Sequence, residues 1–386
     1  MQFIDLAAQQ ARVRDKIDAR IKNVLDHGQY ILGPELLEFE KNLAQYTGTS
    51  CAVTCASGTD AILMALMACG IGPGDAVITT PFTFVATAEV ISLAGAVPVF
   101  VDVDIETMNI DPKSLEKTIE SFKNGDSSNC ALPKGYQDLT LKAILPVDLF
   151  GLPADYDAIT PIADKHDLLV IEDAAQSFGG EYKGKKACGF GVIGCTSFFP
   201  AKPLGCYGDG GAIFTNDEKI LETLESIRVH GQGKVNKYEN VRIGLNSRFD
   251  TLQAAIMLPK LEIFPEEFEM RQNAANKYEE LLKDFVTLQK IPADCRSAWA
   301  QYSFVLKTTA QRTKTQAALK DKNIPSAGYY QIPLHLQKAY SFLDYKQGDF
   351  PASEELSQKI MSIPMHPYIK PEDQELIAKT IKESLE

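Results

Sequence analysis

Apolar runs alternate with helical patterns of polar and apolar residues between about residues 34 and 215. The runs predict short strands at 52–54, 76–79, 97–101, 143–147 and 168–171. Helical patterns lie between most of these runs, at 60–69, 87–94 and 159–165, and Pro34 is well placed in the first turn of an earlier helix. Continuously apolar strands that alternate with helices are typical of a parallel sheet covered on both faces. This part of the chain therefore predicts an α/β domain.

The pattern changes after Thr215. Long, charged, amphipathic stretches predict helices at 218–228 and roughly 251–285, and a strand is predicted near 302–306. Helical patterns then continue to Glu386. This second part predicts a linking helix followed by a small α+β region.

The length of 386 residues favours two domains, at about 150 residues for a typical domain. We predict a large domain over 1–250, which includes the N-terminal segment, and a smaller one over 251–386. The polar segment 124–137 is expected to form a loop inserted in the large domain.

Composition excludes several classes of protein. The chain has 39 basic and 51 acidic residues, a net charge of −12 that disfavours binding to nucleic acid or to anionic membranes. Eight cysteines without a C-x-x-C pair and five scattered histidines indicate neither a metal site nor a disulfide framework. The most apolar stretch, 84–101, is interrupted by Glu89 and Pro98, and no secretory signal is visible at residue 1, so we expect a cytoplasmic protein.

Ligands of open parallel sheets bind beyond the carboxyl ends of the strands, and three such ends carry candidate chemistry. After the first strand, Ser57, Gly58 and Thr59 lead into a helix, where free N–H groups would hold a phosphate, although a plain helix N-cap is the alternative. After the strand at 168–171 comes Asp173, which would pair with a protonated ring nitrogen or, alternatively, cap a helix. Lys202, among apolar residues and prolines, would be an amine nucleophile or a solvated surface charge.

The segment Gly189–Gly194 matches the spacing G-x-G-x-x-G, but it precedes a predicted strand and not a helix. The context of a dinucleotide-binding site is therefore missing, and we predict a turn. A phosphate cradle, a strand-end acid and a lysine, in this order, are instead what pyridoxal 5′-phosphate (PLP) requires.

At these positions the chain resembles the DegT/DnrJ/EryC1/StrS family of PLP-dependent nucleotide-sugar aminotransferases. The resemblance covers nearly the whole chain, and its main segments are 3–6, 28–34, 57–59, 83–87, 172–176, 197–202, 208–212, 244–248 and 333–335. It implies the aspartate-aminotransferase-like, type I PLP fold, with a mostly parallel mixed sheet in the large domain and a smaller α+β domain.

The resemblance also implies roles for individual residues. Lys202 would bind the cofactor and move a proton, and Asp173 would hold the pyridinium proton. Further cofactor contacts would come from Ser57, Gly58, Thr59, Phe84, Ala175, Gln176 and Ser197, and from Asn246 of the partner subunit in a homodimer with shared active sites. Family dehydratases carry histidine at the lysine position, so Lys202 favours amino transfer.

Within the family, the segments 197–211 and 246–255 resemble enzymes that aminate UDP-2-acetamido-2-deoxy-3-keto-D-glucuronic acid for cell-surface polysaccharides such as lipopolysaccharide O-antigen. L-glutamate would be the amino donor and pyridoxamine phosphate (PMP) the intermediate form of the cofactor. Tyr30, Arg248, Tyr330 and His335 are the expected substrate contacts, and Arg248 suits a hexuronate carboxylate.

Alternatives stay open for the substrate. Arg248 would otherwise form an ion pair at the dimer interface, and Asp148 stands where many relatives carry histidine. The substrate would otherwise be UDP-3-keto-N-acetylglucosamine or a dTDP-linked 3- or 4-keto-6-deoxyhexose. The chain would otherwise be a non-catalytic relative that binds the cofactor.

Overall fold

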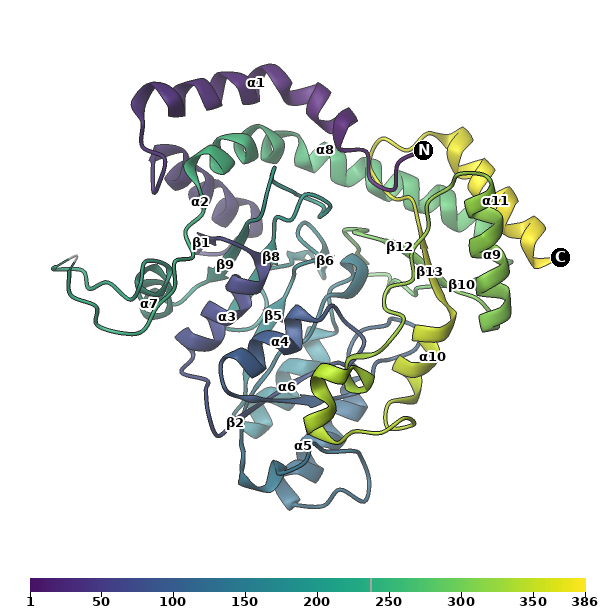
Figure 1. Cartoon of the computed structure of the whole chain (residues 1–386), viewed down its shortest axis with the longest axis horizontal. Helices are drawn as coiled ribbons and strands as arrows, with labels where there is room; N and C mark the ends of the chain where they lie inside the picture. Colours follow the sequence, from purple (N-terminus) through teal and green to yellow (C-terminus); the bar gives the residue numbers. More distant parts are fainter. Residues whose placement is uncertain (237) are drawn as a thin grey trace.

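The computed structural model describes residues 1–236 and 238–386 (Figure 1). The helices are α1 (Leu6–His27), α2 (Pro34–Thr47), α3 (Gly58–Ala68), α4 (Ala86–Leu93), α5 (Pro112–Asn124), α6 (Tyr156–His166), α7 (Glu218–Arg228), α8 (Thr251–Leu282), α9 (Thr309–Asp321), α10 (Pro351–Lys359) and α11 (Pro371–Leu385). The strands are β1 (Cys51–Cys55), β2 (Asp75–Thr79), β3 (Val97–Phe100), β4 (Thr140–Ile144), β5 (Leu169–Asp173), β6 (Glu181–Tyr182), β7 (Lys185–Lys186), β8 (Ile193–Ser197), β9 (Gly211–Thr215), β10 (Thr287–Leu288), β11 (Cys295–Arg296), β12 (Tyr302–Val305) and β13 (Ile360–Ile363).

A seven-stranded sheet forms the centre of the molecule, in the order β1-β9-β8-β5-β4-β2-β3. Strand β9 runs antiparallel to both of its neighbours, and the other neighbouring pairs are parallel. The mostly parallel mixed sheet expected from the sequence is confirmed. Its consequence for function is that the carboxyl ends of β5, β8 and β4 meet at one edge.

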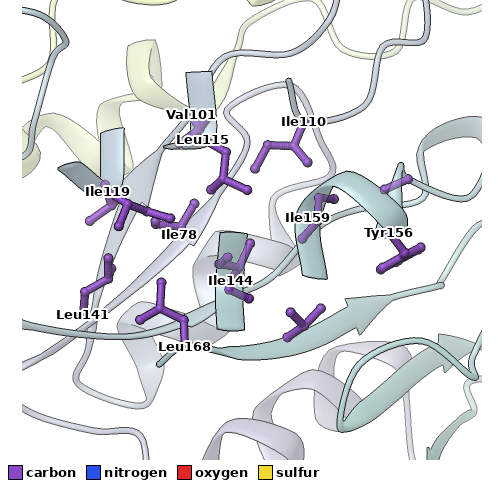
Figure 2. Close-up of a cluster of buried hydrophobic side chains, with 14 of the residues drawn as sticks. Ile78, Val101, Ile110, Leu115, Ile119, Leu141, Ile144, Tyr156, Ile159 and Leu168 are labelled. Atoms are coloured by element: carbon purple, nitrogen blue, oxygen red, sulfur yellow. The ribbon is translucent and has the colours of Figure 1, made fainter. Parts of the chain in front are cut away.

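The apolar strands are buried on both faces, with the alternation that pleated strands impose. On β2, Ala76 and Ile78 face one core, and Val77 faces the other. Figure 2 shows the first of these cores, where Leu115 and Ile119 of α5 lie against Ile144 of β4. The opposite face is covered by α3, α4 and α7, which contribute residues such as Met64, Val90 and Leu224 to the second core.

The C-terminal part forms a three-stranded antiparallel sheet, β10-β12-β13, which packs with α8, α9 and α11. Tyr278 of α8, Leu319 of α9 and Ile377 of α11 are completely buried in this core. The small α+β region is therefore confirmed. The division at residue 250 stays a prediction: β11 pairs with β6 of the first part, and the N terminus lies beside the C-terminal part, where Met365 N donates to Phe3 O (Figure 1).

Three elements differ from the expectation. The strand predicted at 143–147 is shifted to Thr140–Ile144, and only a single bridge at Val147 continues it, because Pro146 has no N–H for a ladder. The sequence analysis missed α1 and α5, although α5 begins with an Asp111 cap followed by Pro112. Among the described residues, no helix is long and apolar enough to cross a membrane.

Candidate active site

A cavity of about 650 Å³ lies at the carboxyl edge of the central sheet. Its walls include nine of the ten residues expected to bind a cofactor: Ser57, Gly58, Thr59, Phe84, Asp173, Ala175, Gln176, Ser197 and Lys202. Asp173 and Ser197 are the last residues of β5 and β8, and Ser57 follows β1. The topology therefore brings together residues that are more than 140 positions apart.

The N terminus of α3 forms one end of the cavity. Ser57 caps the helix, because its Oγ accepts a hydrogen bond from Asp60 N at 3.0 Å, so the N-cap alternative holds for this hydroxyl. The first N–H groups of α3 still lie at the cavity wall, where the helix dipole favours an anion. Residue 58 packs closely against Ser197, another residue of the cavity wall, since a Cβ at residue 58 would lie 2.5 Å from the Cβ of Ser197.

Asp173 lies at the buried side of the cavity and is 4% exposed. Its Oδ2 accepts from Thr87 Oγ1 at 2.8 Å and its Oδ1 accepts from Ala175 N at 3.2 Å. Burial raises the pKa of Asp173, against the opposing effects of these two hydrogen bonds and of the charge on Lys202. A turn follows it rather than an α-helix, so the alternative of a helix N-cap is wrong.

Lys202 lies in the turn between β8 and β9, and its backbone N–H donates to Phe199 O at 2.8 Å. Its side chain lines the cavity beside Phe199, Ala201 and Tyr330. Burial lowers the pKa of Lys202 to about 8, with Asp173 opposing that shift. The lysine is therefore not a solvated surface charge, and a large share of its amine is neutral near pH 8.

One wall of the cavity is formed by Gln176, Tyr330 and Phe84. Gln176 Oε1 accepts from Phe150 N at 2.8 Å, and its Nε2 donates to Tyr330 Oη at 3.2 Å. The rings of Tyr330 and Phe84 lie 6.3 Å apart, tilted by 44°. An amide, a phenol and an exposed aromatic face are thus presented together to the cavity.

Sequence reasoning missed several cavity residues. Thr87 supports Asp173, and Thr83 Oγ1 lies 3.1 Å from Thr87 Oγ1. Their spacing of four, at the start of a helix, was a signal for a shared role. The others are Phe3, Ile4, Ile62, Ala86, Phe199, Ala201, Asp209, Gly210, Gln301 and Tyr329. Phe3 and Gln301 come from opposite ends of the chain, and no local pattern connects them.

Three expected site residues lie together outside this chain's cavity. The main chain of Tyr30 accepts from Thr251 N, and Ile31 bridges Asp250, which places Tyr30 beside the segment that carries Asn246 and Arg248. Asn246 is exposed, and Arg248 is partly buried with no hydrogen-bond partner for its Nε among the described residues.

His335 is the remaining expected contact, and the structure does not bring it to the cavity. Its side chain is completely buried, its Nε2 lies 3.0 Å from Glu354 Oε1, and its ring contacts Phe350 edge-on. Burial lowers the pKa of His335. The expectation of a substrate contact is corrected accordingly, because the side chain serves the packing of this segment.

The cavity fits PLP on its own chemistry. The α3 N terminus, with Ser197 close beside Gly58, suits a phosphate, and Asp173 suits a ring nitrogen. Lys202, with its lowered pKa, lies on the same cavity and suits an aldehyde carbon. All three ends of the cofactor thus have a partner.

Comparison with known proteins identifies the family. The model of the DegT/DnrJ/EryC1/StrS aminotransferase family matches residues 11–382. The chain is 48% identical over 370 residues to the UDP-2-acetamido-2-deoxy-3-oxo-D-glucuronate aminotransferase of Pseudomonas aeruginosa, covering 96% of each chain. A DegT/DnrJ/EryC1/StrS aminotransferase structure from Brucella abortus superposes with a TM-score of 0.93 at 50% identity, covering 99% of each chain.

A third similar structure is NtdA from Bacillus subtilis, solved with bound cofactor PMP. It superposes with a TM-score of 0.88 at 28% identity, and the match covers all of this chain and 85% of that one. The expected type I PLP fold, the cofactor PLP and the aminotransferase activity are confirmed by these relatives together with the fold. The chain belongs to the DegT/DnrJ/EryC1/StrS aminotransferase family.

Proposed function

We propose that the enzyme transfers the amino group of L-glutamate to the 3-keto carbon of UDP-2-acetamido-2-deoxy-3-keto-D-glucuronic acid. The similarity to the Pseudomonas aeruginosa aminotransferase, which extends over 96% of both chains, supports this substrate. The product would be a 2,3-diamino sugar nucleotide for a cell-surface polysaccharide.

When bound, PLP supplies an electron sink that lets an amino group leave one substrate and join another. In our proposal the neutral amine of Lys202 holds the cofactor and then carries a proton to and from the substrate carbon. Asp173 keeps the ring nitrogen of the cofactor protonated. Hydrogen bonds from Thr87 and from the N–H of Ala175 hold the carboxylate of Asp173 in place. Gln176, fixed by Phe150 N, hydrogen-bonds the cofactor hydroxyl.

The observation that carries the choice of a hexuronate is the Nε atom of Arg248, which has no hydrogen-bond partner in the described part of the chain. This atom is also buried. A partly buried guanidinium with a free N–H group suits an anion, and it matches a carboxylate with two parallel hydrogen bonds. The substrate carboxylate at C5 of the sugar supplies that anion in our proposal.

A homodimer with shared sites explains where Arg248 works. Tyr30 lies beside the segment that carries Asn246 and Arg248, outside this chain's own cavity, and Ile243 of that segment is 85% exposed. Ser247 fixes this segment to the α3 end, since its Oγ donates to Asp60 Oδ2 at 2.6 Å. We propose that this surface meets the partner subunit, so that Asn246 reaches the partner's phosphate and Arg248 the partner's sugar.

Incubation of the enzyme with L-glutamate and each candidate keto sugar tests the substrate directly, with amination read by mass spectrometry. A neutral hydroxymethyl group in place of the carboxylate leaves the arginine unpaired, which costs about 3 kcal/mol or about a hundredfold in rate. UDP-3-keto-N-acetylglucosamine should therefore react about a hundredfold more slowly, and Arg248→Lys should reduce this preference. Equal rates on both sugars, or amination of a dTDP-keto hexose alone, would reject the hexuronate.

The shared site has its own test. Lys202→Ala and Asn246→Asp chains are each expected to be inactive as homodimers. Mixed dimers should recover part of the activity, because one of their two sites contains both native residues. Proven heterodimers without any recovery would place Lys202 and Asn246 in the site of one chain.

A further inference from the structure

Two completely buried carboxyl groups lie behind Asp173. Glu172 precedes Asp173 on β5, so its side chain points to the opposite face of the sheet, away from the cavity. Asp148 follows β4 and is tied to the same strand end, because its N–H donates to Asp173 O at 3.1 Å. Neither Asp148 nor Glu172 lines the cavity, and the proposed function uses neither of them.

These two groups gather the loops around the cavity. Asp148 accepts hydrogen bonds from Ala154 N and Tyr156 Oη, both at 2.8 Å, and from Ser177 Oγ at 2.7 Å. Glu172 accepts from Cys188 N at 2.6 Å and from Phe190 N at 2.8 Å. The donors come from the segments that follow β4 and β5 and from the segment that precedes β8. One pair of side chains therefore connects three segments.

The pair needs a proton to be stable. The side chains of Asp148 and Glu172 hydrogen-bond each other, which requires that one carboxyl group donates. Tyr156, Cys188 and Cys195 are titratable groups that interact with the pair, and none of the main effects on the pKa of Asp148 or Glu172 comes from a cation among the described residues. Two like charges buried together without a counter-ion would repel strongly, so one negative charge is what this site can hold.

Hydrogen bonding decides which group keeps the proton. Burial and the charge of Asp148 raise the pKa of Glu172 well above its ordinary value. Burial raises the pKa of Asp148 as well, but Asp148 accepts three hydrogen bonds, from Ser177, Ala154 and Tyr156, whereas Glu172 accepts two, so the negative charge is better stabilised on Asp148. At neutral pH Glu172 is therefore the donor and Asp148 the carboxylate.

We propose that Asp148 and Glu172 share one proton and form a positioning pair that fixes Asp173, Ala175 and Gln176 against the cofactor. Asp148 accepts a hydrogen bond from Ser177, the residue directly after Gln176. Phe150, two residues after Asp148, donates its N–H to Gln176 Oε1. The pair thereby locks the turn 174–177 to the loop 148–151. The effect on catalysis depends on the roles that the proposed function gives to Asp173 and Gln176. The shared proton itself does not depend on those roles.

The proton is tested by the pH dependence of stability in the holoenzyme. The folded protein keeps a proton on Glu172 that the unfolded chain releases above its ordinary pKa, so this residue makes the protein less stable as pH rises. Glu172→Gln cannot release that proton. Its free energy of unfolding should therefore fall less steeply between pH 5 and 8, by about one proton per molecule. Glu280→Gln, at an exposed site on α8, is the matched control and should keep the wild-type slope.

Infrared difference spectra of the wild type and Glu172→Gln provide a second readout, which needs no activity. The wild type should show the carbonyl band of a buried protonated carboxylic acid at pH 8, and the variant should lack it. Equal slopes together with the absence of this band would overturn the shared proton. Because neither readout uses substrate, a wrong sugar or an inactive preparation would leave this test intact.

Kinetics test the positioning role. Glu172→Gln can still donate to Asp148, although its amide nitrogen cannot accept from Cys188 N or Phe190 N as a carboxyl oxygen does, and it should keep the cofactor spectrum. Asp148→Asn instead loses the negative charge that its three donors stabilise. We expect Asp148→Asn to lower kcat by about a hundredfold through misplaced cofactor contacts, and to shift the pH at which the cofactor absorbance changes. An Asp148→Asn enzyme with wild-type kcat and an unshifted absorbance titration would refute the positioning role.

Discussion

Lys202 and Lys260 have the same altered pKa in two different settings. Burial lowers the pKa of each to about 8. Lys202 lines the cavity and has Asp173 as its charged neighbour. Lys260, from α8, is completely buried behind the same loop, where its Nζ donates to Gly205 O and lies 4.5 Å from the centre of the Tyr207 ring. A lowered pKa therefore identifies a desolvated lysine, and access to the cavity distinguishes a candidate nucleophile from a structural one.

Substitution of each lysine in turn tests this contrast, and it is the experiment for which we expect the largest effect. Lys202→Ala should lose more than about a thousandfold in amino transfer, together with the visible absorbance of the bound cofactor. Lys260→Met keeps the length and apolar stem of the side chain and should retain measurable turnover and that absorbance. Steady-state kinetics and absorbance spectra of both purified variants decide. Loss of the cofactor absorbance in Lys260→Met alone would reverse the assignment.

Lys202 has the carboxyl group of Asp173 as its neighbour in the cavity, and Lys260 does not. Asp173→Asn keeps the shape of the side chain but cannot hold a proton on the cofactor ring. We expect it to bind PLP and to lose about a hundredfold to a thousandfold in kcat, as when one preorganised electrostatic contact is removed. Single-turnover kinetics with L-glutamate measure this loss. Wild-type rates would show that Asp173 only orders the turn after β5.

Gly58→Ala probes the end of the cavity at the N terminus of α3, away from Lys202 and Asp173. The new methyl group would meet the Cβ of Ser197 at 2.5 Å, so we expect cofactor affinity to fall by about tenfold. Gly72→Ala is the matched control, because its nearest neighbour would be 3.6 Å away. Titration of the apoenzymes with PLP compares the two. Equal affinities would place the phosphate elsewhere in the cavity.

The smallest effect concerns pH. A lysine with a pKa lowered to about 8 becomes neutral, and thus nucleophilic, as pH rises through that value. The rate at which apoenzyme captures PLP should therefore increase several-fold between about pH 7 and 9 and then level off. Stopped-flow absorbance measures the rate. An increase that continues to pH 10.5 would indicate an ordinary solvated lysine.

The sequence predicted the sheet and most of the cofactor end of the site, because both depend on local patterns. Apolar runs of strand length placed β1, β2, β3 and β5 within two residues, and residues at or just after the ends of β1, β2 and β5 line one cavity. Prediction failed where partners are distant in the chain. Lys260 sits in a charged, amphipathic stretch and resembles a surface residue, yet its partner Gly205 lies 55 positions away.

The same limit explains the remaining differences. His335 was expected to contact substrate, but Glu354 and Phe350 enclose it through a fold of the chain that no motif describes. Tyr30 and Arg248 were expected at the site, and the structure places them together on a surface outside their own cavity.

The central claim is that Lys202, and no other buried lysine, holds the cofactor. Borohydride reduction of the holoenzyme fixes PLP permanently to the amine that holds it, and mass spectrometry of a proteolytic digest then locates the label. We predict stoichiometric labelling of the peptide that contains Lys202 and none at Lys260. A label at Lys260, a label at another lysine, or a fully active holoenzyme without any label after reduction would contradict the account.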